Sequence, residues 1–243
     1  IVIDSVKNNS NDVVVEIYAE DNCKNISTKS ISLKIDITKP KIDVSYSNNK
    51  SEGGRYFKEA RIATIVITER NFNPEDVKFT MSKKATHSEW VESSSGTGNK
   101  DNKRWTSTIN FSEDGDYTFG MSYIDLAGNV ANSVIFAPET VASNAFTIDK
   151  TNPTIKVTYD NNNAVNTNYY NDVRKATIVI NEHNFDSKDV KVTVTANDNG
   201  VAVTPPAVSG WISNGDNHTA TINYNADALY NFDISYKDKA GNV

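Results

Sequence analysis

Three acidic residues occur twice in the same order along the chain. The first set is Asp36, Glu69 and Asp125, and the second, 113 positions later, is Asp149, Glu182 and Asp238. Calcium takes carboxylate and carbonyl oxygens at about 2.3–2.6 Å, and extracellular modules bind it with a Kd of about 10⁻⁴–10⁻³ M. Each set is therefore a candidate calcium site, provided that the fold brings its three members together.

The same residues also have a simpler explanation. Asp125 could accept backbone N–H groups and so hold an Asx-type turn, without any ion. Arg70, the neighbour of Glu69, could neutralise the first set and exclude a metal. The sequence leaves both interpretations open.

Other reactive side chains give no catalytic pattern. His87, His183 and His218 have no histidine at the matching position 113 residues away, and their spacing is not that of metal ligands. We expect them to be solvated loop residues. The single cysteine, Cys23, rules out an intrachain disulfide and cannot form a zinc site alone. The sequence predicts no enzyme.

Two tryptophans are candidates for ligand binding. Trp90 and Trp211 lie within the variable segments 82–104 and 195–218, which we expect to be loops. An exposed tryptophan can stack on a sugar, whereas a structural one packs against the edge of a sheet. Both explanations stay open.

Composition restricts the partners. The formal net charge of −6 opposes binding to phosphate backbones, so we expect no nucleic acid partner. No apolar run approaches the roughly 18–20 residues that span a bilayer, so we expect no membrane insertion. Residue 1 does not begin a signal peptide, and we expect any localisation signal to lie outside this sequence.

The chain is built from a repeat of 113 residues. Several motifs recur at this offset in one order, among them Arg61–Ile67 with Arg174–Ile180 and Asp125–Asn129 with Asp238–Asn242. The predicted domains are the end of an earlier copy (1–36), a full copy (37–149) and a copy that lacks its last strand (150–243). In the earliest copy Lys24 replaces the glycine of the turn, which makes a tight turn there doubtful.

Alternating apolar residues predict short, half-buried strands throughout. Ile42, Val44 and Tyr46 alternate with polar neighbours, as do Ile155, Val157 and Tyr159 at the matching positions. No segment has convincing helical periodicity with caps. About seven strands per repeat describe tandem immunoglobulin-like β-sandwiches, an all-β fold. Pro40 and Pro153 stiffen the short junctions between copies.

This fold would bring the acidic residues together. The start of the first strand, the loop after the second and the loop before the last lie at one pole of an immunoglobulin-like sandwich. Asp36, Glu69 and Asp125 occupy these three places in the full copy. We therefore expect each set of carboxylates to converge at the junction with the preceding domain.

The ordered motifs resemble those of bacterial immunoglobulin-like repeats in Firmicutes surface proteins. The set runs from Asp-x-Thr-x-Pro at 36–40, through Glu-x-Asn-Phe at 69–72, to Tyr-x-Asp-x-Ala-Gly-Asn at 123–129. The resemblance implies arrays in large exported proteins that act as spacers or stalks for other modules, located on the cell surface or secreted. The alternative is an adhesive or carbohydrate-binding module that contacts a host glycan or protein through the variable segments. Neighbouring repeats in the same chain are the expected partners.

Overall fold

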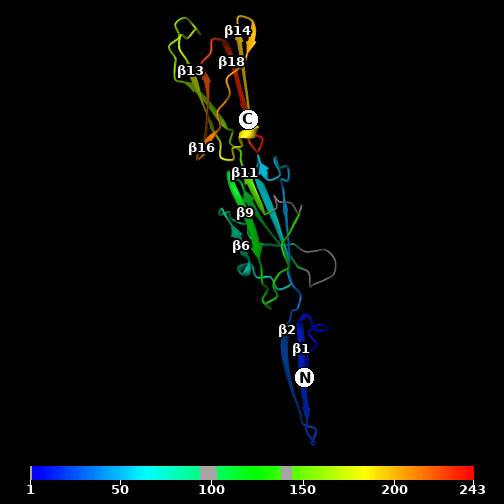
Figure 1. Ribbon diagram of the computed structural model, residues 1–243. Coiled ribbons are helices and arrows are strands. Elements are labelled where there is room, and N and C mark those ends of the chain that lie inside the picture. The colour runs from blue at the N-terminus through cyan, green and yellow to red at the C-terminus, as the bar shows by residue number, and fades with distance from the viewer. Residues whose placement is uncertain (1, 94–102, 138–143) are drawn as a thin grey trace. The chain divides into compact units, whose positions relative to one another are not determined.

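The protein is an all-β chain that a computed structural model divides into two compact units. The structure describes residues 2–93, 103–137 and 144–243. One unit contains Ile1–Lys50 and Ala60–Ile148, and the other contains Ser51–Glu59 and Asp149–Val243. Figure 1 colours the strands of both units by their order in the chain, from blue at the N-terminus to red at the C-terminus. Two short 3₁₀ turns, η1 (Pro74–Asp76) and η3 (Ser187–Asp189), are the helical segments of the described residues.

The chain begins with a long hairpin. β1 (Ser10–Glu20) pairs antiparallel with β2 (Ile26–Ile35) in a separate two-stranded sheet. Both strands contain several β-branched residues, which favour a pleated ribbon. Most of their side chains are exposed, including those of Ile17 and Tyr18.

Two further sheets build the rest of the first unit. One sheet has the order β10-β3-β5-β8-β7, and in the other β11, β9 and β6 lie side by side. The strands of the first sheet are β3 (Lys41–Tyr46), β5 (Arg61–Thr68), β7 (Val91–Ser93), β8 (Arg104–Phe111) and β10 (Ile135–Ala137). Those of the second are β6 (Lys78–Met81), β9 (Gly115–Ser122) and β11 (Ala145–Ile148). The short strand β4 (Tyr56–Phe57) lies in the segment 51–59, which belongs to the other compact unit.

The core of the first unit lies between these two sheets. The rings of Tyr46 in β3 and Phe146 in β11 are 5.8 Å apart, and those of Phe111 in β8 and Phe119 in β9 are also 5.8 Å apart. The predicted alternation of Ile42, Val44 and Tyr46 is confirmed, because all three side chains are buried.

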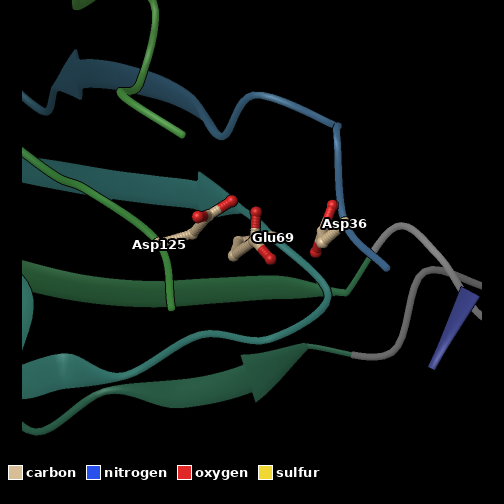
Figure 2. Close-up of side chains that lie close together, drawn as sticks. All are labelled: Asp36, Glu69 and Asp125. Carbon is tan, nitrogen blue, oxygen red and sulfur yellow. The ribbon is translucent and has the colours of Figure 1, made fainter. Parts of the chain in front are cut away.

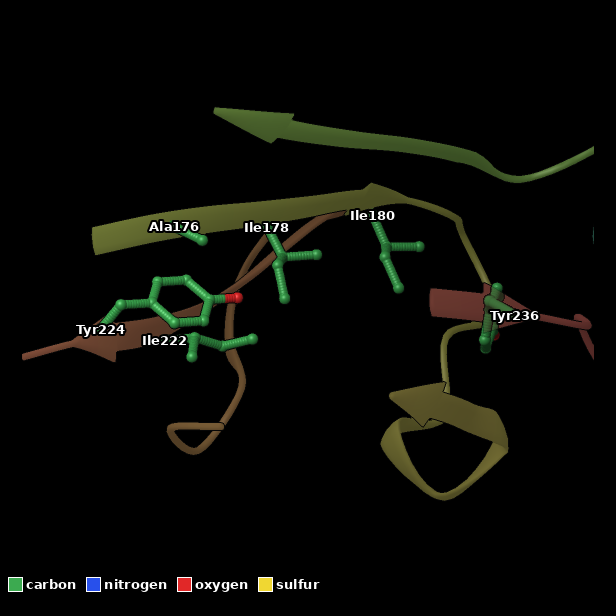
Figure 3. Packing of buried hydrophobic residues seen from close by; sticks show 6 residues of the cluster. All are labelled: Ala176, Ile178, Ile180, Ile222, Tyr224 and Tyr236. Atoms are coloured by element: carbon green, nitrogen blue, oxygen red, sulfur yellow. The ribbon is translucent and has the colours of Figure 1, made fainter. Parts of the chain in front are cut away.

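The second unit repeats this arrangement with fewer strands. One sheet has the order β12-β13-β17-β16 and the other β15-β14-β18. The strands are β12 (Thr154–Tyr159), β13 (Arg174–Asn181), β14 (Val190–Asp198), β15 (Val201–Val203), β16 (Ile212–Asn214), β17 (Asn217–Tyr224) and β18 (Leu229–Tyr236). Figure 3 shows buried side chains of its core, which come from β13, β17 and β18.

Two sequence expectations about this unit fail. Ile155 in β12 is 37% exposed, whereas Ile42, 113 positions earlier, is 1% exposed. The segment 195–218 is not one loop, because it contains the end of β14 and all of β15 and β16. In the first unit the segment 82–104 contains β7, and its residues 94–102 lie outside the described part of the chain. Within the described residues, no helix is long and apolar enough to cross a membrane.

Candidate functional site: two buried carboxylate clusters

The structure brings both sets of acidic residues together. In the first cluster, defined as Asp36, Glu69 and Asp125, one carboxylate oxygen of each residue lies within 4.8 Å of those of the other two. The second cluster satisfies the same limit and consists of Asp149, Glu182 and Asp238. Figure 2 shows the carboxylates of the first cluster side by side, on three different stretches of chain. All three residues of the second cluster are buried.

A tight turn holds the last aspartate of each cluster. Asp125 Oδ1 accepts the backbone N–H groups of Ala127 (2.9 Å) and Asn129 (2.8 Å), and Oδ2 accepts Asn129 Nδ2 at 2.9 Å. Asp238 Oδ1 accepts the N–H groups of Ala240 and Asn242 at 2.9 and 2.8 Å in the same way. The local explanation of these aspartates as turn residues is therefore correct. It leaves a second role open, because a carboxylate oxygen has more than one lone pair.

The same turn occurs a third time, at the tip of the N-terminal hairpin. Asp21 Oδ1 accepts the N–H groups of Cys23 (2.8 Å) and Asn25 (2.9 Å). Lys24 adopts φ 70°, in the left-handed region where Gly128 (φ 87°) and Gly241 (φ 92°) also lie. The sequence-based doubt about this turn was wrong. The hydrogen bonds of Asp21 hold the turn although a non-glycine residue is strained in this conformation.

Each glutamate lies directly after a central strand. Glu69 follows β5 and accepts the N–H of Asn71 on Oε1 at 2.7 Å, and Glu182 follows β13 and accepts the N–H of Asn184 at 2.8 Å. These bonds fold the glutamate side chain back over its own loop. They also place the carboxylate beside the two aspartates.

A ring nitrogen fixes the backbone of each glutamate. Trp105 Nε1 donates to Glu69 O at 3.2 Å, and His218 Nε2 lies 2.8 Å from Glu182 O. Trp105 stacks on Phe72, and His218 stacks on Phe185. His218 is therefore buried and structural, which corrects the expectation of a solvated histidine. The sequence contained an indication of this burial, since the position 113 residues before His218 is occupied by an aromatic residue, Trp105.

Burial and mutual repulsion shape the electrostatics. Burial, and then the charges of Asp36 and Asp125, raise the pKa of Glu69 above its usual range. Burial, and then the charges of Asp149 and Asp238, raise the pKa of Glu182 in the same direction. In both clusters, ionisation of the glutamate costs free energy, because it adds a negative charge beside two aspartates where water solvates it poorly.

The guanidinium of Arg70 offsets part of the negative charge of the first cluster. Arg70 Nη2 lies 3.3 Å from Asp36 Oδ1 in an ion pair whose two side chains are 8% and 4% exposed. Arg70 also donates to Asn9 O (3.2 Å) and to Ile35 O (3.3 Å), which belong to the ends of the hairpin. The first cluster therefore has a built-in positive charge, and Arg70 also ties the hairpin to the loop after β5.

The second cluster has a different neighbour at the matching position. His183 replaces Arg70, and its side chain is 62% exposed and lies 3.0 Å from Asp216 Oδ1. Asn242, whose exposed fraction is 0%, lies between two members of the cluster. Its Nδ2 donates to Asp238 Oδ2 at 2.8 Å and to the backbone oxygen of Asp149 at 3.0 Å. The amide group is thus fixed against the cluster.

The tryptophans proposed for ligand binding take part in ring packing. Trp90 lies 5.0 Å from Phe72, and Trp211 lies 5.2 Å from Phe185, as ring centroids. Both are half-buried. The two phenylalanines occupy matching positions, so the tryptophans have the same place in both units although they are 121 residues apart. His87 and His183 are exposed, as is Cys23.

No model of a known protein family matches the chain, and no curated protein sequence matches it either.

Proposed function

We propose that the chain is a non-catalytic run of tandem immunoglobulin-like β-sandwiches that acts as a spacer in a large exported bacterial protein. The repeated motifs, the paired sheets around an apolar core and the Pro-containing connections support this assignment. In this proposal, successive units joined by short junctions keep the array extended. The array presents other modules of the parent protein at the cell surface or outside the cell.

One observation carries the proposal. The acidic residues that recur at Asp125 and Asp238, and at Glu69 and Glu182, hold turns and loops through hydrogen bonds and are buried rather than displayed to solvent. Asp125 and Asp238 cap equivalent turns, and Glu69 and Glu182 fold back onto equivalent loops. Residues retained for such bonds serve the shape of each unit.

The adhesive alternative has less support. A glycan binder needs exposed aromatic rings on which sugars can stack. The rings of Trp90 and Trp211 instead contact Phe72 and Phe185 and are half-buried. Within the described residues of the segments 82–104 and 195–218, the two tryptophans therefore do not form an exposed aromatic platform.

The spacer proposal predicts that each added repeat increases the length of the protein by a similar amount. A variant with a second copy of residues 37–149 inserted after position 149 should have a larger maximum dimension in small-angle X-ray scattering. The increase should be at least about 25 Å, since an eight-residue strand such as β5 is about 27 Å long. A maximum dimension that stays constant would contradict the spacer role. Saturable binding in a glycan-array screen, lost on replacing Trp90 and Trp211 with alanine, would favour the adhesive alternative.

A further inference from the structure

We propose that the second cluster, Asp149, Glu182 and Asp238, binds a divalent cation that its donor chemistry identifies as calcium. The spacer role does not require such a ligand, so this site goes beyond the proposed function. Three features of the described residues carry the inference: the spacing of the carboxylates, two oxygens without a donor, and a contrast with the first cluster.

The spacing suits one ion. Two oxygens that bind one calcium ion at about 2.4 Å can be at most about 4.8 Å apart. One oxygen from each member of the second cluster lies within 4.8 Å of the others. Three separate loops fix the carboxylate groups, because Thr151, Asn184 and Ala240 donate backbone N–H bonds to them. The arrangement is thus held in place before any ion arrives.

A buried amide oxygen points independently to a missing ligand. Asn242 is fully buried, and Nδ2 of its amide is hydrogen bonded to Asp238 and to the backbone oxygen of Asp149. Within the described residues, Oδ1 of the same amide has no hydrogen-bond partner. Buried polar atoms nearly always have a partner, and this oxygen belongs to an amide that already contacts two members of the cluster. An asparagine oxygen is also an ordinary calcium ligand.

The second cluster has carboxylate oxygens with lone pairs that are available for a cation. In the described part of the chain, Glu182 Oε1 accepts the Asn184 N–H, and Oε2 of the same side chain accepts no hydrogen bond. Asp238 Oδ2 accepts a single bond, from Asn242 Nδ2. Oxygens with remaining lone pairs can bind a cation without breaking the turn that they stabilise.

The donor set selects among metals. The cluster and Asn242 offer oxygen, whereas zinc prefers sulfur and nitrogen ligands. Of the nearby histidine rings, that of His218 contacts Ser213 Oγ and Glu182 O, and His183 Nδ1 lies 3.0 Å from Asp216 Oδ1. Calcium tolerates irregular geometry, as expected for ligands from three loops, whereas magnesium demands a near-ideal octahedron.

The first cluster serves as an internal control. There the Arg70 guanidinium pairs with Asp36 and supplies the positive charge from within the chain. Calcium would have to compete with that ion pair. We therefore expect the first cluster to bind calcium more weakly than the second.

The test is a calcium titration of the full 243-residue chain, previously treated with chelator and followed by backbone amide NMR. The amide signals of Asn184, Ala240 and Asn242 should shift and saturate with a Kd of about 10⁻⁴–10⁻³ M, the range of extracellular calcium modules. Those of Asn71, Ala127 and Asn129 should shift little. Glu182→Gln should raise the Kd at least about tenfold, because calcium affinity follows the charge count of the ligands. The matched change Glu69→Gln should leave it unchanged.

Two results would overturn the proposal. The first is the absence of saturable shifts around the second cluster, or non-saturating shifts of equal size at both clusters, which would indicate only diffuse attraction to an acidic surface. The second is an unchanged Kd in Glu182→Gln. The wild-type titration distinguishes the clusters by itself, so it decides the matter even if Glu182→Gln fails to fold. Scattering that contradicts the spacer role would leave this result unaffected.

Discussion

The turn that holds Asp125 gives the sharpest stability prediction. Gly128 has φ 87°, and a Cβ built at this position meets no atom within 4 Å. Replacing Gly128 with alanine therefore adds backbone strain without a steric clash. The left-handed conformation costs an L-residue about 1–2 kcal/mol. The free energy of unfolding of the first unit should fall by about that amount.

Urea denaturation followed by tryptophan fluorescence measures this change, since Trp90 and Trp105 are in the first unit. The control is Gly120→Ala in β9, where the nearest atom to an added Cβ is Thr80 Cβ at 3.9 Å, an ordinary contact. Glycine within a strand is less favourable than alanine by about 0.5–1 kcal/mol, so this control should be neutral or stabilising. A Gly128→Ala variant as stable as the wild type, or an equal loss of stability in both variants, would contradict the strain assigned to position 128.

Three further changes test other parts of the structure. Lys24→Gly should relieve left-handed strain at the hairpin tip, and slower hydrogen exchange of the Asn25 amide would show it. Ile178→Ala should cost about 2–5 kcal/mol by urea denaturation because the side chain is 0% exposed, and a cost below about 1 kcal/mol would contradict the core assignment. Burial raises the folded-state pKa of Glu182 above 4.5, so ionisation destabilises the folded state. In chelator, the wild type should therefore lose stability relative to Glu182→Gln as the pH rises from 4.5 towards neutrality, and parallel pH profiles would refute this.

Much of the fold could be predicted from local patterns. Period-two alternation marked β3 and β5 correctly, because strands with one buried face must alternate. The acidic residues were also predicted to converge, and both sets do so within 4.8 Å. That prediction depended on repeated positions next to strand ends, where sheet geometry leaves few choices.

The failures have physical causes that local patterns do not contain. Ile155 has the same alternation as Ile42, yet burial depends on the strands that pack beside it. In the first unit β10 pairs with β3, whereas β12 pairs only with β13 in the described second unit. His218 was misjudged because a histidine resembles a solvated residue until its stacking on Phe185 is known. The turn at Lys24 forms because three hydrogen bonds to the carboxylate of Asp21 outweigh the missing glycine.

The central claim is that the chain consists of separate mechanical units, and stretching a single molecule tests it most directly. With the chain held by its two ends, we predict two distinct unfolding events under force. Each should lengthen the chain by about 330 Å, which is the extended length of roughly 100 residues at about 3.6 Å each less the roughly 30 Å that a folded unit already spans. A single event that releases the whole chain, or extension without a resolvable event, would contradict the account.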